Sequence, residues 1–362
     1  MQTVPENRKI SPFLVFFTVT SIQIGVGALG FQRLIAKTAG YDAWISVIIA
    51  GLATNMIMWM MYKLLEMGKK DLSETHKFVF GKWIGSLFNT FFILYFTFFI
   101  ITILRTYIEI VQVWMFPDLN TFWFTLFFLI LCIYIVRGGF RTVTGIAFFG
   151  VVFPSYLIVL FGFTIPYSDF KHFLPLLDHS LKELIIASHQ MSLTFMGYEV
   201  FLIYYPFIKE PNKSKKWAHI GLFSSTALYL YTTLISFAYY SEEQIQKYIW
   251  ATLSTWKIVH LPVVERFEYV GIANWCLIIL PNVCLALWCA SRILKQTYRI
   301  SQRKGVFIIA ALSLLIIPLL KTRQQINMIN RILGNLGFLI NFIYIPFLLI
   351  LVWLLKKVKL KS

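Results

Sequence analysis

Three glycines near the amino end of the chain have the spacing of a known phosphate-binding pattern. Gly25, Gly27 and Gly30 form G-x-G-x-x-G, which cradles a pyrophosphate when a strand precedes it, a helix follows it and an acidic residue lies about 20 positions later. None of these conditions is clearly met, because an apolar run rich in Phe and Val precedes the glycines and long apolar blocks follow. Dinucleotide chemistry is therefore not indicated, and the role of the glycines depends on the medium around them.

A carboxylate in the middle of an apolar block is the second chemical signal. The stretch HQMSLTFMGYEVFLIYYPF, residues 189–207, places Glu199 beside Gly197 and Tyr198. An acidic group at the centre of a membrane helix costs about 2.5–3.5 kcal/mol to insert, so it must face polar partners or water. Two interpretations stay open: Glu199 binds a ligand or works a gate, or it is a fixed hydrogen-bond acceptor that ties this segment to its neighbours.

Other polar side chains lie within the apolar blocks or at their ends. Tyr95 lies deep in one block, where its phenol could close over a small ligand. Further along the same block, Arg105 and Glu109 share a helix face, and their spacing predicts an ion pair near the outer interface. Asn282, next to Pro281, carries a donor and an acceptor that must both find partners in a dry medium.

A charged cluster precedes the block that contains Asn282. Glu265, Arg266 and Glu268 lie within four residues at its outer end. This cluster is interpreted either as a gate or extracellular latch, or as a group of charges that marks the membrane interface.

No signature of an enzyme or of a metal site accompanies these residues. The sequence contains no G-x-S-x-G, H-E-x-x-H or Walker loop, and its six histidines are scattered. Its four cysteines, at positions 132, 276, 284 and 289, lie in apolar segments without C-x-x-C spacing, which indicates neither disulfides nor zinc. We therefore expect no catalysis, no cofactor and no bound metal.

The composition places the chain in a lipid bilayer. Hydrophobic residues make up 58% of it, charged residues 14%, and the mean hydropathy is +0.72, whereas a soluble domain has about 25% charged residues. The formal charge of +17 does not indicate nucleic acid, because the basic residues form short clusters between apolar blocks instead of one basic face.

Ten apolar segments are long enough, or nearly so, to cross a bilayer, which takes about 20 apolar residues. They are too long and too uniformly apolar for barrel strands, so the predicted fold class is an all-α integral membrane protein with ten transmembrane helices. The segments are Pro12 to Ala36, Ala43 to Leu65, Trp83 to Met115, Phe122 to Val136, Gly145 to Phe163, Leu184 to Phe207, Ile220 to Tyr240, Val270 to Ile293, Val306 to Leu320 and Ile332 to Leu355.

Basic residues give the expected orientation. Most of the 33 Lys and Arg residues flank the segments on the side of the amino terminus, which places both termini in the cytoplasm. We expect a single transmembrane domain over residues 1–362, with a first five-helix repeat at 1–163, a second at 182–356 and a basic cytoplasmic tail at 357–362.

The first and sixth segments are predicted to be interrupted helices. Each glycine inside a helix costs about 1 kcal/mol relative to alanine, and the first segment has three together while the sixth has Gly197. Close helix packing at small residues is the alternative. Transporters built from inverted repeats have two such discontinuous helices, which meet at mid-membrane and bind the substrate there.

Four motifs carry a family resemblance over nearly the whole chain. The stretches IGVGALGFQRLIAKTAGYDAWIS (24–46), GKWIGS (81–86), FMGYEVFLIYYPFI (195–208) and ERFE (265–268) resemble the B subunits of nutrient germinant receptors from endospore-forming bacteria. This family is related to the amino acid, polyamine and organocation transporters, so the resemblance implies a LeuT-like fold with five-plus-five inverted repeats.

The resemblance also implies a function and partners. A small nutrient, often an amino acid, is expected between the interrupted helices, in a complex with a membrane-bound A subunit and a lipid-anchored C subunit in the spore inner membrane. Where many relatives have proline, this chain has Gln32. The family motifs place Gly25, Gly27, Ala28, Tyr95, Phe195, Gly197 and Glu199 at the ligand, and Tyr198 and Asn282 complete the predicted ligand-binding set.

Two other functions stay open at this point. The same pocket could move an amino acid together with a proton or sodium, as in a secondary transporter. A structural membrane scaffold is the third possibility, and a bulky residue at Gly25 or Gly197 would then disturb complex assembly equally for all nutrients.

Overall fold

The described part of the first half of the chain contains seven α-helices. In the computed structural model, which describes residues 4–68, 71–259 and 265–359, Asn120 begins one of these helices by accepting the backbone N–H groups of the two residues after Thr121. The helices are α1 (Leu14–Gln23), α2 (Phe31–Ala39), α3 (Ala43–Met67), α4 (Leu72–Trp114), α5 (Thr121–Arg137), α6 (Phe140–Val152) and α7 (Tyr156–Leu160).

The second half contains ten helices among the described residues. Capping boxes at Ser180 and Thr322 fix the starts of two of them, because each hydroxyl accepts a backbone N–H that the helix leaves unpaired. A π-helical turn, Leu339–Tyr344, joins the last two. The helices are α8 (Leu181–Gln190), α9 (Ser192–Phe195), α10 (Phe201–Tyr204), α11 (Lys215–Tyr239), α12 (Glu242–Lys247), α13 (Ala251–Thr255), α14 (Phe267–Tyr298), α15 (Gln302–Ile316), α16 (Arg323–Phe338) and α17 (Ile345–Lys359).

The helices form a membrane-spanning bundle. Within the described residues, seven helical stretches are long and apolar enough to cross a bilayer, and α1 and α5 are shorter apolar helices. The chain is therefore a multi-pass membrane protein with an all-α fold. The exact count of ten crossings and the boundary between two repeats stay predictions.

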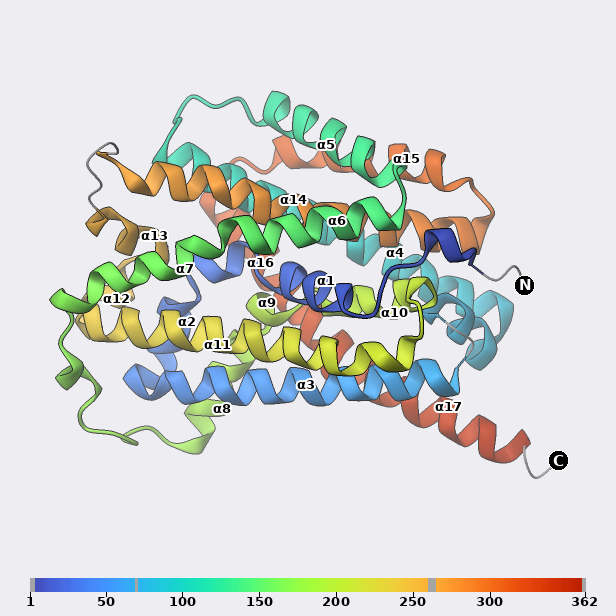
Figure 1. Cartoon of the computed structure of the whole chain (residues 1–362), viewed down its shortest axis with the longest axis horizontal. Coiled ribbons are helices and arrows are strands. Elements are labelled where there is room, and N and C mark those ends of the chain that lie inside the picture. The colour runs from blue at the N-terminus through green and yellow to red at the C-terminus, as the bar shows by residue number, and fades with distance from the viewer. Residues whose placement is uncertain (1–3, 69–70, 260–264, 360–362) are drawn as a thin grey trace.

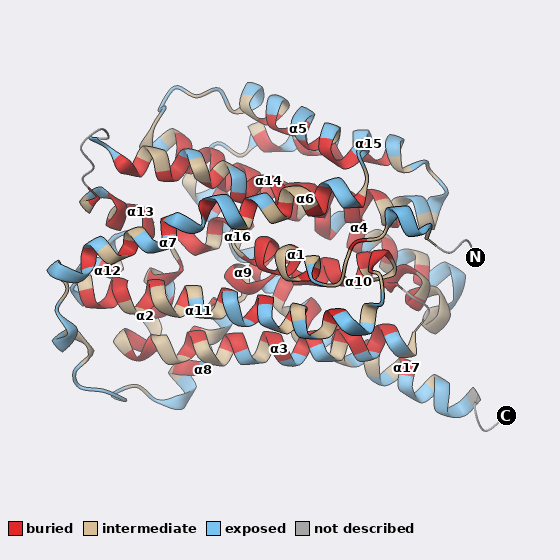
Figure 2. Ribbon diagram, in the orientation of Figure 1, coloured by how far each residue is buried: buried red, intermediate tan, exposed pale blue. Residues whose placement is uncertain are grey.

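The long helices run side by side along one axis of the bundle (Figure 1). α4 and α14 pack against each other along much of their length, and α1 contacts α6, α11 and α14. Apolar residues occur all round α14, as expected for a helix that is covered on every side. Figure 2 shows its residues largely buried, whereas α5 and α15 at one edge carry many exposed ones. The short helices α1, α9 and α10 thus lie among long ones that hold them in place.

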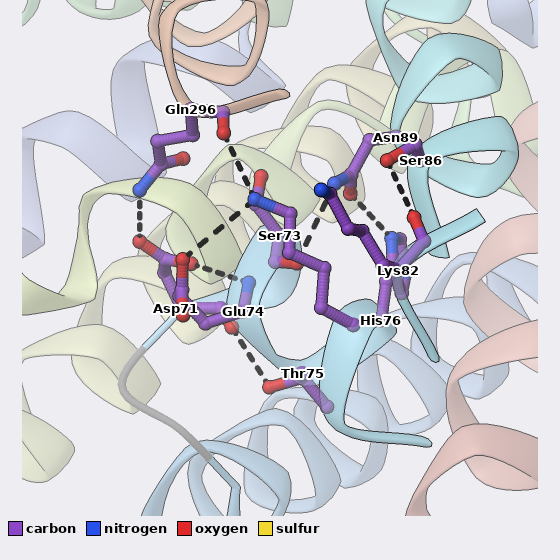
Figure 3. A network of polar contacts seen from close by, with 10 residues as sticks. Asp71, Ser73, Glu74, Thr75, His76, Lys82, Ser86, Asn89 and Gln296 are labelled. Atoms are coloured by element: carbon purple, nitrogen blue, oxygen red, sulfur yellow. Dashed lines mark hydrogen bonds and ion pairs between the residues drawn. The ribbon is translucent and has the colours of Figure 1, made fainter. Parts of the chain in front are cut away.

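A network of polar contacts at the start of α4 ties its first turns to the rest of the bundle, and Figure 3 shows the part that includes Asp71, His76, Asn89 and Gln296. Gly81, with φ +76°, separates a short arm from the rest of α4. In that arm, buried His76 bonds the Asn89 Oδ1 through Nδ1 at 2.7 Å and the Tyr344 hydroxyl through Nε2 at 2.7 Å. Because Asn89 Oδ1 only accepts, Nδ1 carries the hydrogen and Nε2 accepts from the tyrosine.

Asp71 fixes the amino end of the same arm. Its carboxylate accepts the backbone N–H of Glu74 at 2.9 Å and the amide of Gln296, from α14, at 2.6 Å. Burial raises the pKa of the Asp71 carboxyl above its ordinary value, although these hydrogen bonds act in the opposite direction. The arm is therefore held both by α14 and by the π-helical turn.

Replacing His76 with phenylalanine is expected to destabilise the protein by about 1–3 kcal/mol. Phenylalanine keeps the ring among its aromatic neighbours, Phe88 and Phe92, but leaves Asn89 Oδ1 and the Tyr344 hydroxyl without their partner. Thermal unfolding of the purified protein in detergent measures the loss. His189, which is exposed and contacts a phenylalanine ring, is the matched control, and equal melting temperatures for His76→Phe and His189→Phe would contradict the assigned role.

Candidate ligand-binding site

The first interruption lies at the glycine cluster, as the sequence predicts. α1 ends at Gln23, and Gly25 has extended backbone with φ −142° and ψ −152°. A 3₁₀ turn covers Val26–Leu29, and α2 starts at Phe31. Gln32 lies within α2 and donates its amide to the Thr252 hydroxyl of α13 at 2.9 Å. The half of the broken helix that follows the first interruption is thus anchored to α13.

The second interruption lies at Gly197, also as predicted. α9 ends at Phe195, Met196 is extended, and Gly197 has φ +103°. This left-handed conformation strongly favours glycine, because any Cβ would clash with the backbone. A 3₁₀ turn, Tyr198–Val200, then leads into α10. The helix of the sixth predicted segment is therefore interrupted at Gly197.

The two interruptions contact each other. A Cβ added at Gly27 would lie 2.9 Å from both Cα and Oγ1 of Thr194, and one added at Gly197 would lie 2.8 Å from Cγ1 of Ile22. Both distances are shorter than ordinary van der Waals contact. Glycine at these positions is thus what lets two broken helices, far apart in sequence, approach within contact distance.

Side chains satisfy the carbonyl groups that the interruptions release. The side-chain amide of Gln23 donates to the Phe195 carbonyl at 2.9 Å. The backbone carbonyl of Gln23 accepts from the Tyr229 hydroxyl at 2.6 Å. Asn282, a predicted site residue, donates to the Ile24 carbonyl at 3.1 Å. Its Oδ1 is buried and has no hydrogen-bond partner within the described part of the chain. These bonds supply the pairing that a continuous helix would provide.

Glu199 is held by the protein itself. One carboxylate oxygen accepts from the Tyr95 hydroxyl, and the other accepts from the Gly197 N–H at 2.9 Å and the Asn341 amide at 3.3 Å. The residue is 0% exposed. Among the two interpretations of Glu199, this geometry favours the fixed acceptor that joins the second interruption to α4 and to the π-helical turn.

A cavity of about 540 Å³ borders the first interruption and the helix α9 that ends before the second. Gly27 and Gly30 line it from the first, and Leu193 and Thr194 line it from the helix end before the second. The remaining walls are formed by α2, α4, α8, α16 and the loop around Trp250. The cavity is large enough for a small molecule such as an amino acid.

The predicted ligand-binding residues do not all line this cavity. Gly27 lines it, whereas Phe195 and Tyr198 line a neighbouring apolar cavity of about 350 Å³ and Ala28 lines a third of about 410 Å³. The others, Gly25, Tyr95, Gly197, Glu199 and Asn282, are buried in contacts that shape the interruptions. Whether any of them touches a ligand stays a prediction.

Sequence reasoning missed most of the wall that α16 provides. Arg323, Asn327, Arg331 and Asn335 recur at every fourth residue and all line the cavity. The predicted tenth segment began only at Ile332, because the polar residues before it lower the hydropathy. Their spacing of four was the available signal, since it puts them on one helix face.

The charged cluster before α14 pairs locally. Arg266 donates to Glu268 at 3.0 Å, and its guanidinium lies 4.1 Å from the centre of the Tyr269 ring. Glu265 is exposed, and residues 260–264 lie outside the described residues. These contacts join neighbouring residues, so the role of the cluster as a gate or latch stays a prediction.

The predicted ion pair between Arg105 and Glu109 is wrong. Glu109 forms its salt bridge with Arg323 of α16, and Arg105 donates from Nε to the Leu320 carbonyl at 2.6 Å. The spacing of four on one helix offers only a weak pairing, and the approach of α16 to α4 provides partners that the local sequence does not reveal.

Comparison with known proteins gives consistent relatives along the chain. A family model described as spore germination protein matches residues 9–326. Spore germination protein GerQB of Bacillus cereus is 40% identical over 361 residues, which cover 100% of this chain and 99% of that protein. Spore germination protein A2 of Bacillus subtilis (strain 168) is 24% identical over 96% of each chain.

Solved transporter structures share the fold. Mhp1, a nucleobase-cation-symport-1 family transporter in a closed conformation, superposes with a TM-score of 0.67, covering 91% of this chain and 76% of its own at 12% identity. A Na⁺-coupled sialic acid symporter in an outward-open state gives 0.65, with 91% and 77% coverage and 12% identity. The all-helical architecture is thus LeuT-like, and the chain belongs to the spore germination protein family.

Proposed function

We propose that this chain is the nutrient-sensing subunit of a spore germinant receptor. The observation that carries the proposal is the cavity of about 540 Å³ between the first interruption and α9, the helix that ends before the second interruption. A small nutrient, in the first instance an amino acid, binds there and favours one conformation over another, which is what a binding event needs in order to transmit a signal.

The amino end of α2 suits one end of such a ligand. Gly30 and Phe31, where α2 begins, line the cavity. The first N–H groups of a helix lack intrahelical partners and carry the positive end of its dipole, so they attract a carboxylate. An ammonium group would lie toward the carbonyl oxygens of the interruptions. The two interruptions would close around the ligand, and this movement would be passed to the partner subunits.

The proposal includes the location and the partners of the chain. We propose the spore inner membrane, with both termini cytoplasmic, and assembly with the A and C subunits of the receptor. The start of α1 and the end of α17 lie toward the same end of the bundle (Figure 1), which supports an even number of crossings and termini on one side.

An exchange of subunits tests the proposal. Spores in which only this chain is replaced by a paralogue are exposed to a panel of amino acids, nucleosides and sugars, and germination is followed as the fall in optical density. The expected result is that the nutrient preference follows the exchanged chain. An unchanged preference in a receptor that still assembles would overturn the sensing role.

A secondary amino acid transporter is the second candidate, and the fold favours it. The similar solved structures are cation-coupled symporters by their descriptions. Uptake of labelled amino acid into liposomes that contain this chain alone would support transport. Binding without uptake, together with loss of germination on deletion, would support the sensor.

A further inference from the structure

A separate cavity of about 410 Å³, which we call the lateral cavity, also borders the first interruption. Ile24 and Ala28 line it, whereas Val26, Gly27 and Gly30 line the cavity proposed for the nutrient. Residues of α1, α6, α11 and α14 form most of its other walls. α1 contacts both α6 and α11, and these three helices lie on one face of the bundle (Figure 1). The two cavities share no lining residue, so they are separate sites.

The mouth of the lateral cavity faces the hydrocarbon of the membrane. Four of its lining residues are exposed, and they lie just before α7, within α7 and within α11: Ser155, Ile158, Ser224 and Ala227. α7 and α11 belong to stretches that are long and apolar enough to cross a bilayer. None of the lining residues that the structure describes is charged. An occupant therefore enters from the membrane, and most of its surface must be apolar.

Three buried polar groups on the wall of the lateral cavity lack a partner. The indole nitrogens of Trp256 and Trp275 and the hydroxyl of Ser21 form no hydrogen bond within the described part of the chain. These residues are 1%, 6% and 1% exposed. A buried donor that stays unpaired costs free energy, and each such group in a folded protein calls for an explanation. An indole nitrogen only donates, so the wall offers donors and needs an acceptor.

The two indole rings lie next to each other. Their centres are 5.8 Å apart. A Cβ added at Gly271 of α14 would lie 2.4 Å from Cε3 of Trp256, so glycine leaves the space that this ring fills. Because Cε3 and Nε1 lie on opposite edges of an indole, the N–H group of Trp256 is on the edge away from Gly271. Two donors on neighbouring rings suit a carbonyl oxygen, which has two lone pairs.

We propose that the lateral cavity is a second binding site, which takes a membrane-dissolved apolar molecule that presents a carbonyl oxygen to Trp256 and Trp275. A ketone or an ester brings the missing acceptor and adds no donor that would itself need a partner. A hydrocarbon fills the same space but leaves both indole N–H groups unpaired. The carbonyl belongs either to a small molecule dissolved in the bilayer or to the ester group of a bilayer lipid. This site goes beyond the proposed nutrient sensing and does not rest on it.

Photolabelling of the purified receptor with benzophenone, in lipid nanodiscs, tests the proposal. The benzophenone carbonyl is both the hydrogen-bond acceptor and the photoreactive group, and mass spectrometry of peptides locates the label. We expect the label on peptides that line the lateral cavity. We also expect 1-tetralone to compete at least tenfold better than tetralin, which has the same skeleton without the oxygen, when both are compared at equal mole fraction in the lipid.

The double variant W256F/W275F removes the two donors and keeps two aromatic rings. Its labelling in the lateral cavity is expected to fall at least tenfold. Trp114→Phe is the matched control, because the Trp114 indole nitrogen is also buried and unpaired in the described part of the chain but lies outside this cavity. Labelling in this control is expected to stay unchanged. Equal labelling of the double variant and the control, at similar melting temperatures, overturns the proposal.

The comparison of ketone and hydrocarbon keeps the test decisive if the double variant does not fold. Equal competition by 1-tetralone and tetralin on the unchanged protein overturns the proposal, because the indole N–H groups would then contribute nothing to binding. Absence of label from the peptides that line the lateral cavity overturns it as well. Nutrient binding is no part of these measurements, so their failure leaves the sensing function to its own test.

Lipid chemistry separates the two sources of the carbonyl. Nanodiscs are prepared from diester phosphatidylglycerol and from its diether analogue, which has no ester carbonyl. With the preference for the ketone established, equal labelling in the two lipids assigns the site to a small dissolved molecule. Labelling that is at least threefold stronger in the diether lipid assigns it to the lipid ester group, because the competing ester is then missing. Either result supports a site for a carbonyl-bearing apolar molecule.

Discussion

Spores whose only copy of this chain carries Gly27→Ala are expected to need at least ten times more nutrient for half-maximal germination. The added methyl carbon would lie 2.9 Å from the backbone Cα of Thr194, and a main-chain atom cannot rotate away as a side chain can. Overpacking of this kind costs about 1–3 kcal/mol, and about 1.4 kcal/mol corresponds to tenfold in an equilibrium. The cost falls on the contact between the two interruptions, where we propose that the ligand is sensed.

Gly145→Ala is the matched control for this prediction. A Cβ at Gly145 meets no heavy atom within 4 Å, and the residue lies within α6. Its germination response is expected to stay unchanged, since alanine in a helix is favoured over glycine. Receptor abundance in the membrane is measured for both variants by immunoblot. If the two variants responded equally to the nutrient at equal abundance, the contact between the interruptions would have no part in nutrient sensing.

Glu199→Ala is expected to cause the largest loss of stability, on the order of 3–5 kcal/mol. The substitution leaves the Tyr95 hydroxyl, the Gly197 N–H and one bond of the Asn341 amide without their acceptor in a fully buried place. Glu199→Gln keeps one acceptor oxygen, so a smaller loss is expected. In thermal unfolding of the purified receptor in detergent, we expect the melting temperature to be highest for the unchanged protein, lower for Glu199→Gln and lowest for Glu199→Ala.

An exposed glutamate serves as the control for Glu199. Glu243 pairs with Lys247 on the surface of α12, and surface pairs of this kind contribute about 0–1 kcal/mol. Glu243→Ala is therefore expected to melt close to the unchanged protein. If Glu199→Ala melted as Glu243→Ala does, the carboxylate would not be the fixed acceptor that joins the second interruption to its neighbours.

The interruptions could be predicted from the sequence because their cause is local. Glycine weakens a helix wherever it occurs, and the breaks fall at Gly25 to Gly30 and at Gly197, as expected. Helix ends in uniformly apolar segments were equally accessible: the predicted segment from Ala43 to Leu65 corresponds to α3, Ala43–Met67. Both signals are contained in a few neighbouring residues.

The walls of the cavity could not be predicted in the same way, because they depend on contacts between distant segments. The polar residues of α16 lower its hydropathy, so the predicted segment left out its first turns. The same polar residues line the cavity. Glu109 likewise forms its salt bridge with Arg323, more than 200 positions away, and not with its neighbour Arg105. For Asn282 the sequence predicted that the side-chain amide needs partners, but only the fold shows that its N–H group donates to the Ile24 carbonyl.

Protection of an introduced cysteine by the nutrient tests the central claim most directly. Asn335 is exposed and lines the cavity, whereas Gln324 is exposed on the same helix outside the lining. Three of the four native cysteines are buried, and Cys276 is partly so. In membranes that contain the receptor, a thiol reagent is applied to Asn335→Cys and Gln324→Cys with and without the germinating nutrient. We predict that the nutrient slows modification at position 335 at least tenfold and leaves position 324 unchanged. Equal modification rates at position 335 with and without a concentration of nutrient that triggers germination would contradict the account.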